Sequence, residues 1–388
     1  MDVSVTPPPP PEISLNDKFD EIRAGIAEEY LSREQNHPWI LAFSGGKDST
    51  LLAHLVFEAL LALPKPSRTR PIYFCSNDTL VENPPVAEHM AVSLQEILRA
   101  AKILNLPIDG EIRKPKRGET FWDLLIGKGY PTPKTSFRWC TDRLKIQPTS
   151  EYIKEKIADN GNVIILMGVR KDESITRKNS IEKHKNLHQS NLTPHSTLKG
   201  ALIYRPIMEV TTDEVWEFLA SNNPPWGGTH ARLINLYRDA GGGECPVVIS
   251  PEEAPGCGTN SSRFGCWVCT VITKDRSLQG FVDTGKHNFQ PLLDFRDKLI
   301  EMRDNPEYRQ LRRRNGKIEF KNSKHITGPF TIAARQQILE ELLQTQSKSG
   351  LPLISQEEIN FCRGTWAEDI LKQDEQDKQL PSSQGVKK

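Results

Sequence analysis

The stretch HPWILAFSGGKDSTLLAHL, residues 37–55, decides the fold. An apolar strand, Trp39–Phe43, leads into a short polar loop, and an apolar helix over residues 49–63 follows. The loop reads Ser44, Gly45, Gly46, Lys47, Asp48, Ser49 and Thr50. Glycines let a backbone approach an anion closely, and the start of a helix offers free N–H groups and the positive end of its dipole. The order of strand, glycine loop and helix therefore predicts a phosphate-binding loop.

The loop is not a Walker A sequence, because that pattern requires Ser or Thr directly after the lysine and here Asp48 follows it. We expect Lys47 to neutralise phosphate charge as a bond breaks. We expect Asp48 either to hold Mg²⁺ or to brace the loop. The hydroxyls of Ser44, Ser49 and Thr50 add hydrogen-bond donors.

The first half of the chain alternates strand and helix patterns. Helices are predicted over residues 13–34 and 87–104, and strands over residues 71–75 and 161–168. This alternation predicts an α/β fold with a parallel sheet. A further helix is expected to begin at Thr211 or Thr212, capped with the help of Glu214.

We expect five regions along the chain. They are a flexible proline-rich tail (1–12), a nucleotide-binding domain (13–210), a helix with a cysteine-rich segment (211–287), a basic helical region (288–378) and a disordered tail (379–388). Neither a signal-peptide pattern nor an apolar run long enough to span a bilayer is present, so we expect a cytoplasmic protein.

The 51 basic and 50 acidic residues leave a net charge of +1. A molecule-wide field for nucleic acid is therefore absent, and any basic contact surface must be local. The segment RDNPEYRQLRRRNGKIEFKNSK, residues 303–324, has eight Lys or Arg against three acids, with Tyr308 and Phe320 interleaved. It suits either a DNA backbone or a solvated helix face. The candidate DNA contacts are Arg312, Arg313, Arg314 and Lys317.

Four of the seven cysteines lie within 25 residues of a glycine-rich segment. They are Cys245, Cys257, Cys266 and Cys269, with the spacing C-x11-C-x8-C-x2-C. Seven cysteines in an intracellular chain favour metal or redox chemistry over a disulfide scaffold. Four thiolates could converge on zinc or an iron–sulfur cluster, and the spacing does not choose between them. Coordination would add folding free energy to this segment.

Cys140 lies apart from these four, in SFRWCTDRLKIQP. Arg138, Arg143 and Lys145 are expected to lower the pKa of its thiol and favour the nucleophilic thiolate. Three roles stay open for Cys140: it carries sulfur as a persulfide, it replaces one of the four metal ligands, or it is inert. Cys75 and Cys362 are expected to be ordinary packed thiols.

SGGKDST resembles the PP-loop of the ATP pyrophosphatases, a superfamily that includes the sulfonucleotide reductases. YFCSNDTLVENP (residues 73–84) fits the same family, and MGVRKDESITR (residues 167–177) looks like a segment of the reductase branch. The resemblance implies that ATP is cleaved between its α and β phosphates. It also implies nucleotide contacts outside the loop, by Asn77, Asp78, Gly168, Arg170 and Arg177, with the two arginines gripping phosphate.

The chain combines several short motifs, which are FSGGKDST, RWCTDRLK, GVRKDES, GECP and GCWVC, followed by TGPFTIAARQQILEELL. This combination resembles the DndC family, the PP-loop sulfurtransferases of DNA phosphorothioation, over residues 13–345. The resemblance implies that ATP activates a DNA backbone phosphate and that sulfur replaces a non-bridging oxygen. A cysteine desulfurase would supply the sulfur, other proteins of the Dnd complex would be partners, and the chain would carry a [4Fe–4S] cluster.

Three other functions stay open. A sulfonucleotide reductase is disfavoured because the catalytic cysteine of a C-terminal E-C-G-type tail has no counterpart here. A non-catalytic DNA-binding module with a structural metal is disfavoured by the intact loop. A tRNA thiolation enzyme is disfavoured only by the resemblance over the whole chain.

Overall fold

The computed structural model describes residues 14–34, 36–173, 192–240, 264–321 and 324–379. The chain divides into two compact units. The first, the sheet unit, comprises Met1–Ser76, Ala91–Glu111 and Ile153–Leu233. The second, the cysteine unit, comprises Asn77–Met90, Ile112–Tyr152 and Ile234–Lys388.

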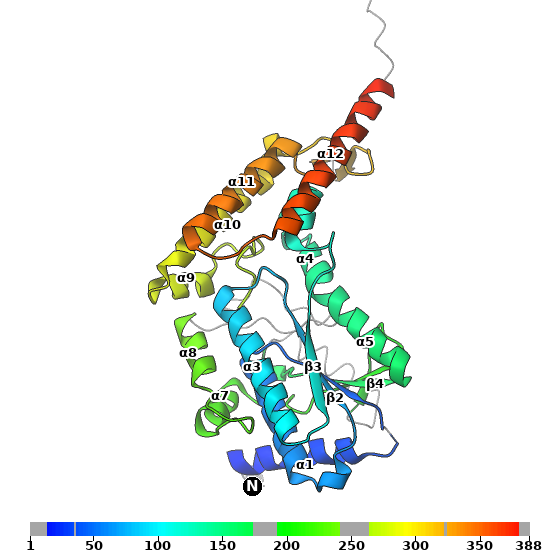
Figure 1. Ribbon diagram of the computed structural model, residues 1–388, viewed down its shortest axis with the longest axis vertical. Coiled ribbons are helices and arrows are strands. Elements are labelled where there is room, and N and C mark those ends of the chain that lie inside the picture. The colour runs from blue at the N-terminus through cyan, green and yellow to red at the C-terminus, as the bar shows by residue number, and fades with distance from the viewer. Residues whose placement is uncertain (1–13, 35, 174–191, 241–263, 322–323, 380–388) are drawn as a thin grey trace, which may run out of the picture. The chain divides into compact units, whose positions relative to one another are not determined.

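A six-stranded sheet forms the centre of the sheet unit, as the alternating pattern predicted (Figure 1). In sheet order its strands are β3 (Ile108–Arg113), β2 (Ile72–Asn77), β1 (Trp39–Ala42), β4 (Val163–Leu166), β6 (Ala201–Tyr204) and β5 (Leu192–Pro194). Strand β1 runs parallel to both β2 and β4, and β4 runs parallel to β6. The edge strand β5 is antiparallel to β6. The α/β fold with a mostly parallel sheet is thus confirmed.

The chain order of the strands reverses between β1 and β4. From β1 the sheet grows to β2 and β3 on one side, and from β4 it grows to β6 and β5 on the other. All four residues of β1 and all four of β4 are buried, which suits their continuous apolar runs. Ligands of open α/β sheets bind beyond the carboxyl ends of the strands at such a reversal. The loop after β1 and the segment after β4 therefore meet where a ligand site is expected.

Helices surround the sheet. Their bounds are α1 (Leu15–Leu31), α2 (Lys47–Ala62), α3 (Pro84–Ile103), α5 (Gln147–Asn160) and α7 (Thr212–Ser221). Helix α8 (Ala231–Asp239) begins in this unit and has most of its residues in the cysteine unit. Helix α2 packs against α1 and α7. Helix α7 begins with the predicted capping box, in which the Thr211 side chain accepts from Glu214 N and the Glu214 carboxylate accepts from Thr211 N.

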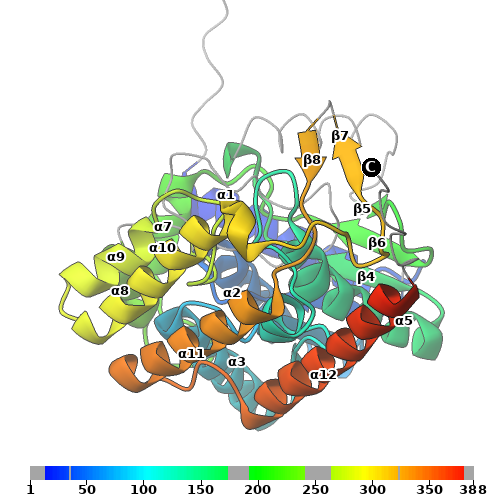
Figure 2. The same ribbon diagram turned by 90° about the horizontal axis from the view of Figure 1, so that it is seen from above.

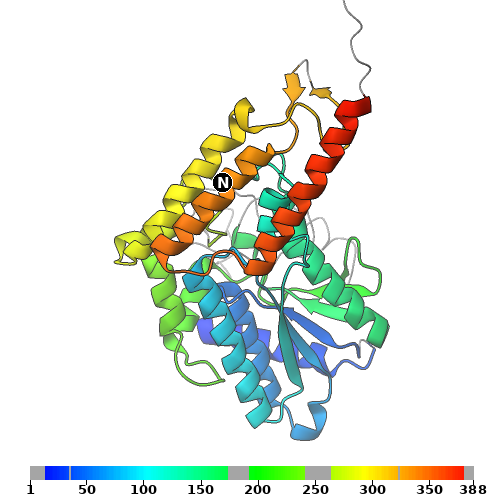
Figure 3. The ribbon, with the colours of Figure 1, turned by 45° about the horizontal axis from the view of Figure 1, so that its top comes forward.

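The cysteine unit is mainly helical. Its further helices are α4 (Trp139–Thr141), α9 (Arg276–Asp283), α10 (Gln290–Asp304), α11 (Ile332–Ser349) and α12 (Gln356–Gln379). Helix α11 lies alongside α10, and α12 packs on a π-helical turn at Asp123–Gly127 (Figure 3). Helix α11 begins at the N-cap Thr331 and ends at Gly350, whose φ of 70° is left-handed.

The basic stretch between α10 and α11 contains a β-hairpin, which the sequence analysis did not predict (Figure 2). Strands β7 (Glu319–Lys321) and β8 (Lys324–Ile326) pair in antiparallel register. A tight turn precedes them, with Gly316 at φ 79° and a hydrogen bond from Arg313 N to Lys317 O. The helical C-terminal region is therefore interrupted by extended structure where Gly316 breaks the helix pattern. Among the described helices, none is long and apolar enough to cross a bilayer.

Arg335 joins three parts of the cysteine unit. It is 1% exposed, and its guanidinium donates to the carbonyls of Phe330 and Gly127 and to Asp369 on α12 at 2.7 Å. Burial lowers the pKa of Arg335, and the Asp369 carboxylate opposes that shift. The guanidinium therefore stabilises the packing of α11 and α12 around the Gly127 turn.

We expect Arg335→Ala to lower the free energy of unfolding by about 3 kcal/mol, because it leaves a carboxylate and two carbonyls without their donor. Arg363 on α12 is exposed and serves as the control. Arg363→Ala should change the free energy of unfolding by less than about 0.5 kcal/mol. Urea denaturation followed by tryptophan fluorescence measures both. Equal effects of the two substitutions would contradict the role given to Arg335.

Candidate functional site

The glycine loop is held in shape by its own hydroxyl groups. Gly45 has a left-handed φ of 74°, which glycine adopts without strain. Ser44 and Ser49 share a hydrogen bond of 3.1 Å between their Oγ atoms. Gly46 N donates to Ser44 Oγ, and Ser49 Oγ donates to Gly46 O. The loop therefore has a defined backbone path without a ligand.

The start of α2 has the properties of an anion site. Its N-cap is Gly46, whose lack of a side chain leaves the first N–H groups without a side-chain cap. The helix is 16 residues long, so its positive dipole end lies at this loop. The buried Thr50 Oγ1 has no hydrogen-bond partner among the described residues. Backbone donors and an unsatisfied hydroxyl fit a phosphate group.

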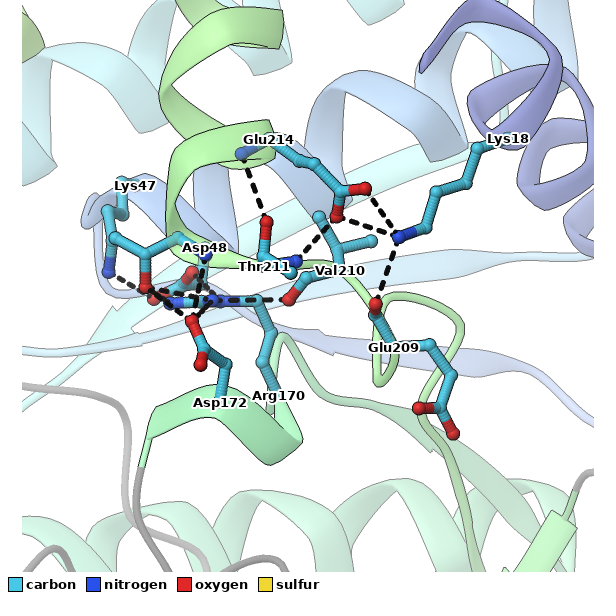
Figure 4. Close-up of polar contacts among 10 residues, drawn as sticks. Lys18, Lys47, Asp48, Arg170, Asp172, Glu209, Val210, Thr211 and Glu214 are labelled. Atoms are coloured by element: carbon cyan, nitrogen blue, oxygen red, sulfur yellow. Dashed lines mark hydrogen bonds and ion pairs between the residues drawn. The ribbon is translucent and has the colours of Figure 1, made fainter. Parts of the chain in front are cut away.

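Lys47, Asp48 and Arg170 form a buried charge cluster beneath the loop (Figure 4). The Lys47 ammonium lies 3.0 Å from Asp48 Oδ2, and Arg170 Nε donates to Asp48 Oδ1. The side chains are 9%, 7% and 1% exposed, respectively. Both oxygens of Asp48 are thus engaged by cations of the chain. Of the two roles expected for Asp48, these contacts fit the brace.

Arg170 directs its donors at the protein. Its NH1 group lies 3.2 Å from the carbonyl oxygen of Val210 and from Thr212 Oγ1. Thr212 in turn donates to Asp172, and these hydrogen bonds lower the pKa of that carboxyl. We expected Arg170 to bind phosphate. In the structure its guanidinium instead contacts Asp48, Val210 O and Thr212. The second expected phosphate ligand, Arg177, lies outside the described residues.

The capping box of α7 positions the carbonyl and hydroxyl that Arg170 uses. Lys18 donates to both oxygens of Glu214 at 2.7 Å and to Glu209 O at 3.0 Å (Figure 4). This ties α1 to the first turn of α7, where Val210 and Thr212 flank the cap. Sequence reasoning missed Lys18 and Thr212, because their partners lie more than 40 residues away along the chain.

Gly168 ends the strand segment that faces the loop. A Cβ atom at this position would lie 2.9 Å from Asp48 O and 3.2 Å from Ser49 N. These are backbone atoms that cannot turn away as a flexible side chain would. The predicted site residue Gly168 therefore permits a close approach between the end of β4 and the start of α2.

Asn77 and Asp78, the predicted contacts after the second strand, belong to the cysteine unit. The Asn77 amide donates to Thr149 Oγ1 at 2.5 Å, and its Oδ1 has no partner among the described residues. Asp78 accepts from Leu80 N, and burial raises the pKa of its carboxyl. The two residues thus provide one unsatisfied amide oxygen and one partly buried acid.

Cys266 and Cys269 lie in one tight turn, with Cys269 N donating to Cys266 O at 2.9 Å. Thr79 Oγ1 lies 3.5 Å from Cys266 Sγ and donates to Glu82, which pairs with Lys145 at 3.2 Å. The other two members of the quartet, Cys245 and Cys257, lie outside the described residues. The part of the chain that is described holds no group of three His, Cys, Asp or Glu arranged for a metal ion.

The expectation of a lowered pKa at Cys140 is wrong. Burial, and to a lesser degree a thiolate at Cys269, raise the pKa of this thiol to about 11. Arg138 and Lys145 act in the opposite direction, but the Lys145 charge is already paired with Glu82. Cys140 is therefore a partly exposed thiol with a raised pKa, and its charge interacts with Cys269 of the C-x-x-C turn.

Two arginines of α10 hold the segment that follows the cysteines. Arg296, 1% exposed, donates to the carbonyls of Cys269, Ile272 and Thr273. Arg303 donates to Thr270 O at 2.8 Å. Carbonyl groups in an irregular segment need such donors when they are buried. Sequence reasoning missed both arginines, since a helical arginine carries no sign that it faces inward.

The four candidate DNA contacts differ in their surroundings. Arg314 donates to Lys128 O at 2.6 Å and lies 3.5 Å from Asp369. Arg312 is exposed and donates to Gly316 O, and Lys317 is exposed. Arg313 lies 3.9 Å from Glu319, with both side chains about two-fifths exposed. All four are thus at least partly open to solvent, and Arg314 in addition contacts Lys128 O and Asp369.

A double-mutant cycle tests the brace beneath the loop. Arg170→Leu and Asp48→Asn should each lower the free energy of unfolding by about 3 kcal/mol, since each leaves a buried partner unpaired. The double substitution should cost less than their sum, with a coupling of about 2 kcal/mol or more. The exposed pair Arg232–Glu96, 2.8 Å apart in the same unit, is the control and should couple by less than about 1 kcal/mol. Equal coupling of the two pairs would refute the brace.

Comparison with known proteins agrees with this geometry. Residues 38–272 match the model of the phosphoadenosine phosphosulfate reductase domain. An uncharacterized protein of Methanocaldococcus jannaschii is 28% identical over 191 residues, which are 49% of this chain and 32% of that protein. A second uncharacterized protein of that organism is 25% identical over 279 residues, 68% of this chain and 56% of that one. The aligned regions thus span between a third and somewhat more than half of these relatives.

Solved structures of low identity also resemble the chain. The phosphoadenylyl-sulfate reductase of Candida auris has a TM-score of 0.34 at 14% identity, covering 54% of this chain and 88% of that one. A U34-tRNA thiolase of Methanococcus maripaludis, solved with its [4Fe–4S] cluster, has 0.32 at 14%, covering 73% and 80%. The NAD⁺ synthetase of Burkholderia pseudomallei has 0.38 at 13%, covering 88% and 92%.

The matched family model covers more than half of the chain, from the strand before the glycine loop to the segment after the C-x-x-C turn. It includes Lys47, Asp48, Gly168 and Arg170, which the fold brings together at the reversal of the sheet. The chain belongs to the phosphoadenosine phosphosulfate reductase domain family, with a PP-loop at its candidate nucleotide site.

Proposed function

We propose that this chain is an ATP-dependent sulfurtransferase of DNA phosphorothioation. The observation that carries the ATP-dependent part is the glycine loop at the start of α2, with Lys47 and Asp48 fixed above Arg170. The part concerning DNA rests on the resemblance of the cysteine-rich motifs to the DndC family and on the exposed cations near Lys317.

In the first step a non-bridging oxygen of a DNA phosphodiester attacks the α phosphorus of ATP. A new P–O bond forms, the bond between the α phosphorus and the bridging oxygen breaks, and pyrophosphate leaves. The N–H groups at the start of α2 and the Lys47 ammonium would stabilise the charge that develops on pyrophosphate. Mg²⁺ would be brought by the ATP phosphates, which are hard oxygen ligands.

In the second step a sulfur nucleophile attacks the adenylated DNA phosphorus and AMP leaves. Adenylation turns a poor leaving oxygen into part of a good leaving group, which is how ATP supplies the driving force. Sulfur from a cysteine desulfurase arrives as a persulfide. Release of the thiophosphate from that persulfide requires two electrons from a thiol reductant. Other proteins of the phosphorothioation system would act as partners.

Cys266 and Cys269 would hold an iron–sulfur cluster together with Cys245 and Cys257, unless Cys140 replaces one of these four. Such a cluster would supply redox or sulfur-binding chemistry when bound. The two thiols of the C-x-x-C turn and the thiol of Cys140 suit a cationic metal, which favours their thiolate forms.

Pyrophosphate release tests the loop. In the presence of Mg²⁺-ATP and DNA, Lys47→Ala should lose at least about a hundredfold of the release rate, because it removes a charge from the transition state. Gly168→Ala should lose activity as well, since its Cβ would push Asp48 and Ser49 apart from the strand end. Gly364→Ala lies in the exposed part of α12, where a Cβ meets nothing within 4 Å, and should leave the rate unchanged. Wild-type release by Lys47→Ala with its fold retained would disprove the assignment.

Metal analysis tests the cysteines. Anaerobically purified protein should contain about four iron and four acid-labile sulfide per chain. Cys266→Ser should lose most of this iron, as should Cys140→Ser if Cys140 replaces one of the four ligands, whereas Cys362→Ala, at a buried thiol beside Trp122 O, should retain it. Zinc without sulfide would contradict the cluster. Full iron in Cys140→Ser with loss of sulfur transfer would assign Cys140 the role of sulfur carrier.

A further inference from the structure

The β7–β8 hairpin exposes apolar side chains beside cations. Phe320 is 67% exposed, Leu311 71% and Ile318 49%, so three of the ten exposed large hydrophobic residues described for the chain fall within ten positions. Single exposed apolar side chains are ordinary, but a group of them marks an interaction surface. The two-residue spacing of Ile318 and Phe320 in extended chain puts them on one face.

The hairpin stands on a fixed base. Arg309 pairs with Phe330 in an antiparallel bridge, and Gln310 N donates to Pro329 O at 2.8 Å. Arg309 also donates to the carbonyl of Gly328, and burial lowers the pKa of its guanidinium to about 10. The exposure of Phe320 is therefore a property of an anchored element and not of a loose end.

The register of the hairpin brings an aromatic pair next to a lysine pair. Phe320 is opposite His325, with ring centroids 5.6 Å apart, and Lys321 is opposite Lys324. His325 Nε2 donates to Leu311 O at 2.9 Å, which fixes the imidazole beside the Phe320 ring. The two rings are tilted by 57° to one another, so a planar group can stack on the exposed Phe320 ring while His325 lies beside it.

The nearby charges are positive and partly unneutralised. Arg312 and Lys317 are exposed, and Arg313 lies 3.9 Å from the carboxylate of Glu319, a long distance for an ion pair. A partner that covers this surface must offer both flat apolar faces and negative charge. A nucleic-acid strand offers both, but only where a base is unpaired, because stacking covers the base faces in a duplex.

We propose that the β7–β8 hairpin binds an unpaired base of DNA, stacked on the Phe320 ring with His325 at its side, while Arg312, Arg313 and Lys317 contact adjacent phosphates. This inference rests on the proposed function for its choice of DNA, and it adds that the DNA is held where its strands are locally open. A phosphodiester beside an unstacked base is also easier to approach than one in a regular duplex.

Binding of the full chain to labelled oligonucleotides without ATP tests the hairpin. Phe320→Ala should weaken binding of single-stranded DNA by about fivefold or more, and Phe320→Tyr should retain it. The same substitution should weaken binding of duplex DNA of that sequence by a smaller factor. Leu371→Ala, at a residue 64% exposed on α12, is the matched control and should bind as the wild type does.

The salt dependence separates the phosphate contacts from stacking. Arg312→Ala and Lys317→Ala should each reduce the slope of log K against log salt for single-stranded DNA by about 0.7, whereas Phe320→Ala should leave that slope unchanged. Unchanged single-strand binding by Phe320→Ala, or equal losses for single-stranded and duplex DNA, would overturn the proposal. Tighter binding of RNA than of DNA would overturn the choice of DNA. Because this assay needs no ATP, failure of pyrophosphate release would refute the sulfurtransferase function and leave the hairpin result standing.

Discussion

The buried carboxylate of Asp48 is the constraint on which the sheet unit depends. A carboxylate taken out of water costs several kcal/mol unless cations and donors compensate it. Arg170 from the segment after β4 and Lys47 from the same loop supply that compensation. The loop after β1 and the segment after β4 are consequently tied together at the reversal of the sheet. Gly168 also permits this close approach, because a Cβ atom at its position would lie 2.9 Å from Asp48 O.

In the cysteine unit, arginine side chains satisfy buried backbone carbonyls rather than a buried carboxylate. Between its helices the chain has long irregular stretches, whose buried carbonyls need donors. Arg296 serves the carbonyls after Cys269, and Arg335 serves Gly127 and Phe330. A guanidinium has five donors in a fixed plane, so one arginine can satisfy several carbonyls that no regular ladder reaches. The donors of Arg296 and Arg335 are thus used within the framework of the unit.

The features that the sequence predicted are those encoded over short distances. The glycine loop between strand and helix and the Thr211–Glu214 capping box depend on neighbouring residues, so their spacing suffices. The pKa of Cys140 depends on burial by distant segments, and the sequence showed only the cations beside it. Arg170 was recognised as a site residue, but its direction toward Asp48, 122 positions away, could not follow from its own segment. The β7–β8 hairpin was missed because its many charges obscure the alternation in residues 318–320.

Charge sets a limit on how this chain alone holds DNA. With a net charge of +1 it has no long-range field to steer a polyanion, so attraction begins only near the local cations. Three phosphate contacts on the hairpin would give a salt slope of about −2 for a single strand, well below that of proteins with many contacts. Stacking on Phe320 then contributes a large share of the affinity and is insensitive to salt. A strand held in this way would be bound more through its unpaired bases than through its backbone. Partner proteins that open or bend the DNA would therefore strengthen binding without contacting this hairpin.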